Sequence, residues 1–425
     1  MTSARTPAAS AARPEEQAAA RTDARPQVVY VWQYREWGGA QTYLLGQIPR
    51  VRRHYDVRVL IPDGSTPILL HDLARRGIAH ETFGPAVASA PAAGLRARLT
   101  DRAGRRRSAL ALERYVRQTT PPGSILHCDI GPWYAFPLLR RLLRRYRVVV
   151  TLHTAVLKPS PARAASWRFK LARLFRQSGF ALIAANRDVR GSLAPYVSPP
   201  VLSRIPIAYS FVDRDEIQQA RQVRLSRADL AQRFDLPADR FWVVTLGQFI
   251  ERKGCRELLA AAARLDPAQY QFLWIATEPP HAAQAALIAA ARLGRCFQIV
   301  THGDLGGDRA TLLAALATAD AFALPSLQEG LPLALIEAMA VGLPCISTRI
   351  NAIPEAIESG VSGLLIPPGS VDALVEALET LRRDPDLRTR LAAEGRRRAD
   401  TQFELTTTAE ATLKVYDELR RDAVR

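Results

Sequence analysis

Short apolar runs alternate with helical patterns along most of this chain of 425 residues. Runs of this kind are typical of strands buried on both faces of a parallel sheet, which needs helices as its connections. In the first half we predict strands at 28–33, 56–62, 124–129, 147–153 and 180–186. The pattern starts again after residue 215, at 241–249, 272–277, 296–304, 321–326, 344–349 and 363–368. Each series predicts a doubly wound α/β domain.

The length of the chain also predicts two domains. Residues 1–26 are rich in Ala, Arg, Pro and Glu and lack an apolar core, which predicts a disordered tail rather than a signal peptide. We assign residues 27–215 to an N-terminal Rossmann-like domain and 216–402 to a second one. A C-terminal helix in 403–425 is expected to pack back on the first domain. Two such sheets face a central cleft, where doubly wound sheets bind ligands.

The net charge of +17 is unevenly distributed. Residues 1–200 hold 32 lysines and arginines against 12 aspartates and glutamates, whereas residues 201–425 are slightly acidic. The first domain is therefore expected to face something acidic. The run at 138–147 pairs leucines with arginines at helical spacing, and two interpretations stay open: a membrane-surface helix, or an amphipathic helix with a solvated basic face.

Cellular location is predicted from the cysteines and from hydropathy. The four cysteines are far apart and form no CxxC pair, which indicates reduced thiols rather than disulfides or a zinc site. No apolar run is long enough to span a bilayer. We predict a cytoplasmic protein, with peripheral association at the inner face of the cell membrane as the alternative.

Two glutamates interrupt the apolar stretch PSLQEGLPLALIEAMAVGLPCIST at 325–348. The segment from Pro332 onward reads as a helix that enters a core, where a carboxylate is costly to bury unless something pairs with it. Glu337 is therefore expected either at a solvent-facing helix edge or beside a partner from outside the chain. Glu329 falls in the loop between a strand's carboxyl end and that helix.

A nucleotide is the outside partner that fits both glutamates. Free backbone N–H groups near Gly330, Leu331 and Leu333, at the start of the helix, would suit a diphosphate. Glu337 lies about a turn and a half further on, within reach of a neighbouring ribose. One carboxylate can accept hydrogen bonds from both hydroxyls of a vicinal diol. The segment GQFIERKG at 247–254 adds Arg252 and Lys253 at the same edge, where they can neutralise a leaving diphosphate.

With these motifs the sequence resembles the retaining GT-B glycosyltransferases of family 4, from about residue 28 to the C-terminus. The most specific feature is the E-x7-E spacing of Glu329 and Glu337 in EGLPLALIEAMAVGLP, followed by SGLLIPPGS. In the first domain GGAQ at 38–41 resembles the family's glycine loop, and TLHT at 151–154 carries its histidine at a strand end.

The resemblance implies a role for each matching residue. Glu337 binds the donor ribose, Glu329 contacts the transferred sugar, and Lys253 binds the diphosphate. In the first domain, Gly38 and Gly39 let the backbone approach the donor. His153 lies near the reacting sugar, although by itself a histidine at a strand end is more often a satisfied core residue.

The resemblance also implies that no metal or other cofactor is required. At Gln248 the sequence departs from the family, which usually has an arginine there. Gln248 carries no positive charge, so phosphate stabilisation is expected from Lys253 and Arg252 alone.

The predicted function is transfer of a sugar from a nucleotide sugar to a glycan, a lipid-linked saccharide or another hydroxyl acceptor, in synthesis of a surface polysaccharide or glycoconjugate. Three alternatives stay open. The acceptor is a small soluble natural product, or the protein is a GT-B relative such as an epimerase or phosphorylase. The basic composition also admits nucleic-acid binding, but no binding module is recognisable and we expect no nucleic acid as a partner.

Overall fold

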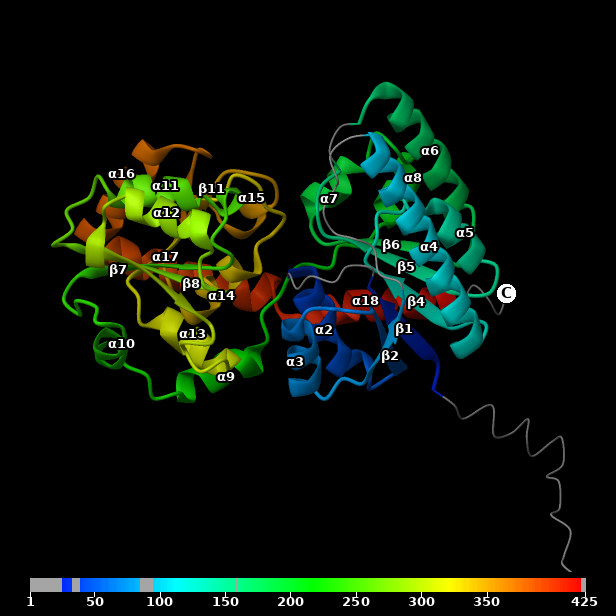
Figure 1. Cartoon of the computed structure of the whole chain (residues 1–425), viewed down its shortest axis with the longest axis horizontal. Coiled ribbons are helices and arrows are strands. Elements are labelled where there is room, and N and C mark those ends of the chain that lie inside the picture. The colour runs from blue at the N-terminus through cyan, green and yellow to red at the C-terminus, as the bar shows by residue number, and fades with distance from the viewer. Residues whose placement is uncertain (1–24, 33–38, 85–94, 157–158, 422–425) are drawn as a thin grey trace, which may run out of the picture.

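The structure is a computed structural model that describes residues 25–32, 39–84, 95–156 and 159–421. It contains two parallel sheets of six strands, each covered by helices on both faces (Figure 1). The first sheet has the order β3-β2-β1-β4-β5-β6, and the second has the order β12-β11-β10-β7-β8-β9. In both sheets the order reverses beside the first strand, between β1 and β4 and between β7 and β10.

The first domain follows the expected alternation and adds one short edge strand. Its strands are β1 (Gln27–Val31), β2 (Asp56–Pro62), β3 (His80–Phe83), β4 (Ile125–Cys128), β5 (Arg147–Leu152) and β6 (Phe180–Ala184). Its helices are α2 (Gly39–Val51), α3 (Pro67–Arg75), α4 (Leu95–Thr119), α5 (Phe136–Leu142), α6 (Pro161–Phe175), α7 (Arg187–Ser192) and α8 (Pro199–Arg204). The sequence reading missed β3, because HETF at the sheet edge is mostly polar.

The second domain has its six strands at the predicted places. They are β7 (Phe241–Leu246), β8 (Tyr270–Ala276), β9 (Phe297–Thr301), β10 (Ala321–Leu324), β11 (Cys345–Thr348) and β12 (Leu364–Ile366). The helices of this half are α9 (Arg214–Gln222), α10 (Arg227–Phe234), α11 (Cys255–Ala262), α12 (Ala282–Ala290), α13 (Arg309–Ala317), α14 (Leu333–Val341), α15 (Ile353–Ala356), α16 (Val371–Arg383), α17 (Pro385–Gln402) and α18 (Leu405–Arg421). Short 3-10 turns lie at Glu251–Lys253 and Gly294–Cys296.

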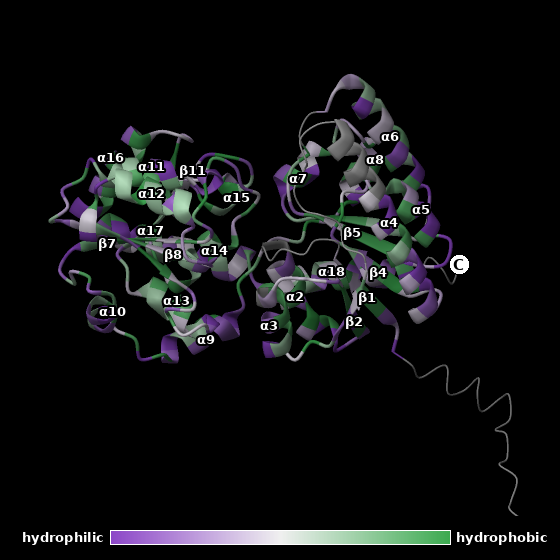
Figure 2. Ribbon diagram, viewed as in Figure 1, coloured by the Kyte–Doolittle hydropathy of each residue, from purple (hydrophilic) through white to green (hydrophobic). Residues whose placement is uncertain are grey.

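Each sheet separates two hydrophobic cores. Along β1, Val29 and Val31 pack into one core, whereas Val28 and Tyr30 pack into the other. This alternation explains why the strands read as continuous apolar runs, since every position is buried on one side or the other. Figure 2 shows the result: the strands are hydrophobic, and the hydrophilic residues gather on the outer helices.

Two helical regions of the chain are divided by local caps. The segment 218–234 divides into α9 and α10, because Ser226 forms a capping box with Asp229 and starts a new helix. The C-terminal region consists of α16, α17 and α18. Asp384 caps the start of α17, and that helix ends at Gln402.

The basic run at 138–147 is only partly helical. Helix α5 ends at Leu142, and Leu138, Leu139 and Leu142 are buried against the first domain. Arg144 and Arg145 lie exposed in the turn that follows. The leucines are therefore core residues, and this segment by itself is not a free membrane-surface helix.

The C-terminal helix α18 packs against α2 and β6 of the first domain. Tyr416 from α18 reaches the sheet, where its hydroxyl lies 2.5 Å from Nδ1 of His127 on β4. The other ring nitrogen of His127 lies 2.6 Å from the hydroxyl of Thr151. His127 is fully buried with both nitrogens partnered, so it is a structural histidine.

Burial also gives a prediction for pH. Burial, together with the smaller effect of the charge of nearby His153, lowers the pKa of His127 to about 3. Because the unfolded chain binds the proton more tightly, the stability contributed by His127 falls as pH drops from about 6.5 toward 3. Between pH 7 and pH 5 this amounts to about 2 kcal/mol of unfolding free energy. Urea unfolding of the wild type and of His127→Gln at both pH values should show a weaker pH dependence in the variant. His54→Gln, at an exposed histidine, is the control, and an unchanged dependence in His127→Gln would contradict the prediction.

Candidate functional site

The loops that follow the strands bring the predicted residues to the carboxyl edges of the two sheets. In the second domain, β7 leads into the loop that carries Gln248, Arg252 and Lys253, and β10 leads into the loop that carries Glu329. These strands are neighbours at the point where the strand order reverses. Such a point is the usual ligand site of a doubly wound sheet.

Glu329 is held between two cations. Lys253 Nζ lies 2.8 Å from Glu329 Oε1, and Arg252 Nη1 lies 3.2 Å from Glu329 Oε2. The Glu329 side chain is 8% exposed and that of Lys253 is 12% exposed. The pair is therefore largely removed from water, and its charges act through a low dielectric. Gln248 is exposed and lies beside this pair in sequence.

The loop that carries Lys253 is built to approach the neighbouring loop closely. Gly254 has a φ of +76°, and a Cβ there would come within 2.0 Å of the carbonyl oxygen of Pro325. The backbone N–H groups of Leu327 and Gln328 donate to the carbonyl of Arg252. Only glycine fits such a crossing, which fixes Lys253 against Glu329.

Glu337 corrects an expectation. The sequence offered solvent or an outside partner, but the Glu337 side chain is 3% exposed and its carboxylate Oε1 accepts a hydrogen bond from Nη2 of Arg309 at the start of α13. Both alternatives missed a partner from the same chain. Arg309 Nε also donates to Glu216 Oε2 of α9, at 3.3 Å. Arg309 thus bridges two carboxylates from two helices.

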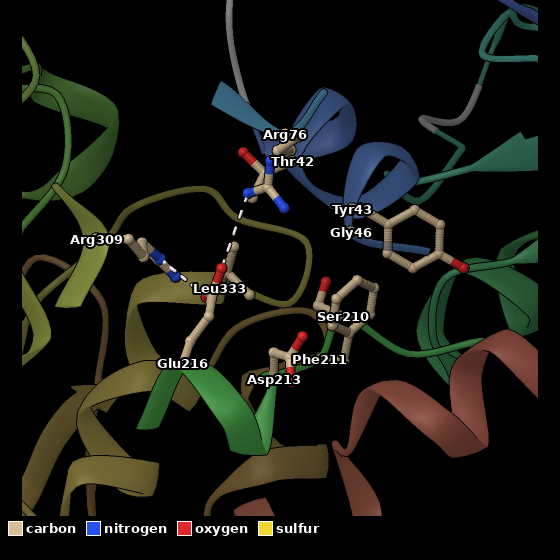
Figure 3. A pocket seen from close by; sticks show the side chains of 10 residues that line it. All are labelled: Thr42, Tyr43, Gly46, Arg76, Ser210, Phe211, Asp213, Glu216, Arg309 and Leu333. Carbon is tan, nitrogen blue, oxygen red and sulfur yellow. Dashed lines mark hydrogen bonds and ion pairs between the residues drawn. The ribbon is translucent and has the colours of Figure 1, made fainter. Parts of the chain in front are cut away.

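Arg309 and Glu216 line a pocket between the domains, shown in Figure 3. Its second-domain wall includes Glu216, Arg309 and Leu333, and its first-domain wall includes Arg76 and Tyr43. Arg76 Nη2 lies 4.0 Å from Glu216 Oε1. The charged side chains therefore alternate in sign along a row that runs from Arg76 of the first domain through Glu216 and Arg309 to Glu337.

His153 lies at the end of β5, in the first-domain wall of the cleft. Its Nε2 is buried without a hydrogen-bond partner among the described residues, and Asp129 Oδ1 lies 3.9 Å away. Burial lowers the pKa of His153 and raises the pKa of Asp129, while each opposes the shift of the other. Near neutral pH the imidazole is therefore uncharged. An unpartnered buried nitrogen suits contact with a ligand hydroxyl.

The two domains touch beside His153. A Cβ at Gly330 would lie 2.6 Å from the carbonyl oxygen of His153 and 3.9 Å from Nδ2 of Asn186. Asn186 Nδ2 is also buried without a partner among the described residues. Gly330 of the second domain therefore faces polar atoms of the first domain.

A carboxylate fixes the domains nearby. Glu355 of α15 accepts hydrogen bonds from the backbone N–H groups of Arg187 and Asp188, at 2.9 and 2.8 Å. Both lie at the start of α7 in the first domain. Tyr209, in the connection between the domains, donates its hydroxyl to the same carboxylate at 2.8 Å. Glu355 thereby links three segments that would move apart if the cleft opened.

The other predicted residues lie as follows. Gly39 begins α2, and Gly38 lies outside the described residues. Leu331 is buried before α14, Leu333 begins α14 beside the pocket, and Pro332 is the N-cap rather than part of the first turn. Within the described ranges, no group of three or more His, Cys, Asp and Glu residues could hold a metal ion. The four cysteines are buried and free.

Most of the second domain matches a known protein family in sequence. Residues 240–384 match the family described as glycosyl transferases group 1. The chain is 30% identical over 277 residues to MMP alpha-(1->4)-mannosyltransferase of Mycolicibacterium hassiacum, covering 56% of this chain and 66% of the relative. It is 32% identical over 195 residues to the lipopolysaccharide core biosynthesis glycosyltransferase LpsE of Rhizobium meliloti, covering 46% of this chain and 54% of the relative. The matches thus span between half and two thirds of the length of these two relatives.

Solved structures decide the fold. The crystal structure of Anabaena Alr3699/HepE in complex with UDP and glucose superposes with a TM-score of 0.70 and 16% identity, covering 92% of this chain and all of the other. The fold is GT-B. The sequence prediction of two Rossmann-like domains that face a cleft is confirmed, and GT-B glycosyltransferases are the proteins this chain resembles in sequence and structure.

Three polar residues at the site escaped the sequence reading. Asp129 and Asn186 each follow a buried strand, a position that marks the sheet's carboxyl edge and offered a signal. Arg309 offered none, because it is one arginine in a helix that starts 28 residues before Glu337 in the chain.

The contact at Gly330 can be tested. In Gly330→Ala the new methyl group would clash with the His153 carbonyl, so the domains should separate slightly and stability should fall by about 1–3 kcal/mol. Small-angle scattering should show a larger radius of gyration for the variant. Gly191→Ala is the control, because a Cβ there meets nothing within 4 Å. A Gly330→Ala variant with unchanged scattering would contradict the close approach of the domains.

Proposed function

We propose that this protein is a retaining glycosyltransferase of family 4 that transfers a hexose from a nucleotide sugar to a hydroxyl acceptor without an obligatory metal. The observation that carries the proposal is the Lys253–Glu329 pair at the reversal point of the second sheet, with Glu337 one helix segment behind it. In this proposal the cation is Lys253, the sugar-binding carboxylate is Glu329 and the ribose-binding carboxylate is Glu337. They follow one another along one edge of the second sheet. The match of residues 240–384 to glycosyl transferases group 1 supports the same reading.

The proposed roles of the site residues follow from where charge develops during the reaction. Departure of a nucleoside diphosphate from the sugar leaves positive character on the sugar and negative charge on the phosphate. Lys253, Arg252 and the first N–H groups of α14, near Gly330, Leu331 and Leu333, lie where they can stabilise that charge. With Gln248 in place of a cation, Lys253 carries most of this task.

The sugar itself would lie between the domains. Glu329 can accept its hydroxyls from the second-domain side, and His153 can contact it from the first-domain side. We infer retention by attack on the face from which the phosphate leaves, with the phosphate oxygen taking the acceptor proton. Closure around Gly330, and around Gly38 and Gly39 in the first domain, would exclude water and limit donor hydrolysis.

The acceptor would bind mainly to the first domain. A glycan or lipid-linked saccharide of a surface polysaccharide pathway is favoured, because LpsE acts in lipopolysaccharide core biosynthesis and resembles this chain. The first domain carries exposed arginines, and on α6 the exposed Phe169 and Arg173 lie one turn apart, with Arg173 over the ring. Helices α5 and α6 lie along the outer edge of this domain (Figure 1). No described helix is long and apolar enough to cross a membrane.

Nucleotide release from UDP-, GDP-, ADP- and dTDP-sugars tests the donor assignment. Release from one donor is expected, and Glu329→Ala should lower turnover about 100-fold or more, because a hydrogen-bonding carboxylate at the reacting sugar is lost. Glu337→Ala should instead weaken nucleotide affinity about tenfold. Calorimetry measures the second effect, and product assays measure the first.

The matched control is Glu379→Ala, which removes the exposed partner of Arg383 on α16. It should leave turnover and affinity unchanged. Full activity in both Glu329→Ala and Glu337→Ala would overturn the site. A donor cleaved equally well by all variants would point to another centre.

Flotation with vesicles that contain anionic phosphatidylglycerol tests the membrane surface. At low salt the protein should bind, and binding should weaken as salt is added, because exposed arginines act through screened charge. The double variant Phe169→Ala, Arg173→Gln should bind less than Arg264→Gln, an exposed arginine in the second domain. A wild-type protein that remains unbound at low salt would contradict membrane association.

A further inference from the structure

Arg309 is a largely buried cation, with 19% of its side chain exposed, that the proposed reaction does not use. It stands at the first position of α13, where the side chain of Asp308 caps the helix. Burial alone would lower the pKa of Arg309, but the charges of Glu337 and Glu216 raise it above its ordinary value. The guanidinium is therefore a permanent charge fixed between two carboxylates.

The hydrogen bond from Arg309 leaves one carboxylate oxygen of Glu337 available. Arg309 donates to Oε1 of Glu337, and among the described residues no hydrogen bond reaches Oε2. Arg309 therefore fixes one oxygen of the carboxylate and leaves the other free to accept a hydrogen bond.

The orientation of Arg309 is set by the second carboxylate. Glu216 on α9 holds Nε, so the flat guanidinium cannot turn away from Glu337 without losing that bond. Arg76, the C-cap of α3, has its Nη2 4.0 Å from Oε1 of Glu216 and brings the first domain to the end of the row (Figure 3). The fork geometry of arginine is what allows one side chain to serve both carboxylates.

We propose that Arg309 is a positioning residue for the nucleotide: it holds one oxygen of the Glu337 carboxylate so that the second oxygen is turned to accept a ribose hydroxyl. This inference rests on the proposed function, in which Glu337 binds the donor ribose. It predicts that Arg309 contributes to the choice of ribose over deoxyribose without touching the nucleotide.

Calorimetry with UDP and 2′-deoxy-UDP tests the proposal, with ADP and GDP and their 2′-deoxy forms measured in parallel. The full-length wild type should prefer the ribonucleotide about tenfold, the worth of a hydrogen bond to an ionised carboxylate. Arg309→Met should reduce this preference to about twofold or less and leave the affinity for the deoxynucleotide nearly unchanged. Arg309→Lys keeps the charge and should retain part of the preference, and Glu216→Gln should lose part of it.

A double-mutant cycle separates positioning from direct contact and from misfolding. Glu337→Gln should also abolish the preference, and adding Arg309→Met to Glu337→Gln should change nothing further. Arg264→Met, at an exposed arginine of the same domain, is the control and should behave as the wild type. Thermal melting of each variant shows that it is folded.

Three results would overturn the inference. If Arg309→Met weakened both nucleotides equally in both backgrounds, Arg309 would be a phosphate ligand. If Arg309→Met kept the full ribose preference, Glu337 would not depend on Arg309 for its position. If the wild type bound none of these nucleotides, the proposed function would fail, and the inference with it.

Discussion

Every strand of both sheets is parallel to its neighbours, so every strand ends at the same edge of its sheet as the others. Because of this constraint, the loops that follow the strands lie together at one edge of each sheet, where the cleft is. Lys253 and Glu329 are 76 residues apart, yet they meet because β7 and β10 are adjacent where the strand order reverses. The same rule brings Asp129, His153 and Asn186 together in the first domain, after β4, β5 and β6.

Most carboxylates at this edge are paired with a cation or with backbone N–H groups of the same chain. Glu329 is paired with two cations, Glu337 with Arg309, and Glu355 with two backbone N–H groups of the other domain. Burying these carboxylates unpaired would cost several kcal/mol each. The exceptions lie where a sugar is proposed to bind, because the buried nitrogens of His153 and Asn186 have no partner among the described residues. Ser326 Oγ, in the loop after β10, is a further buried polar atom without a partner among the described residues.

Contacts between the two domains fix their relative position. Gly330 admits the His153 carbonyl, Glu355 caps α7, and the row from Arg76 to Glu337 crosses the cleft. Helix α18 then returns to the first domain and is fixed at His127 through Tyr416. Each contact joins residues from distant parts of the chain. The relative position of the domains and the chemistry of the site are therefore linked.

The sequence by itself determined the fold class and most strand positions, because a strand buried on both faces must be apolar at every position and is visible locally. It also placed Glu329 in a loop and Glu337 in the helix that follows it. It missed the short edge strand β3, which is mostly polar. Only the tertiary structure decided which partner Glu337 takes. Arg309 reaches it through the packing of α13 beside α14, and helix packing depends on the whole domain rather than on any local pattern.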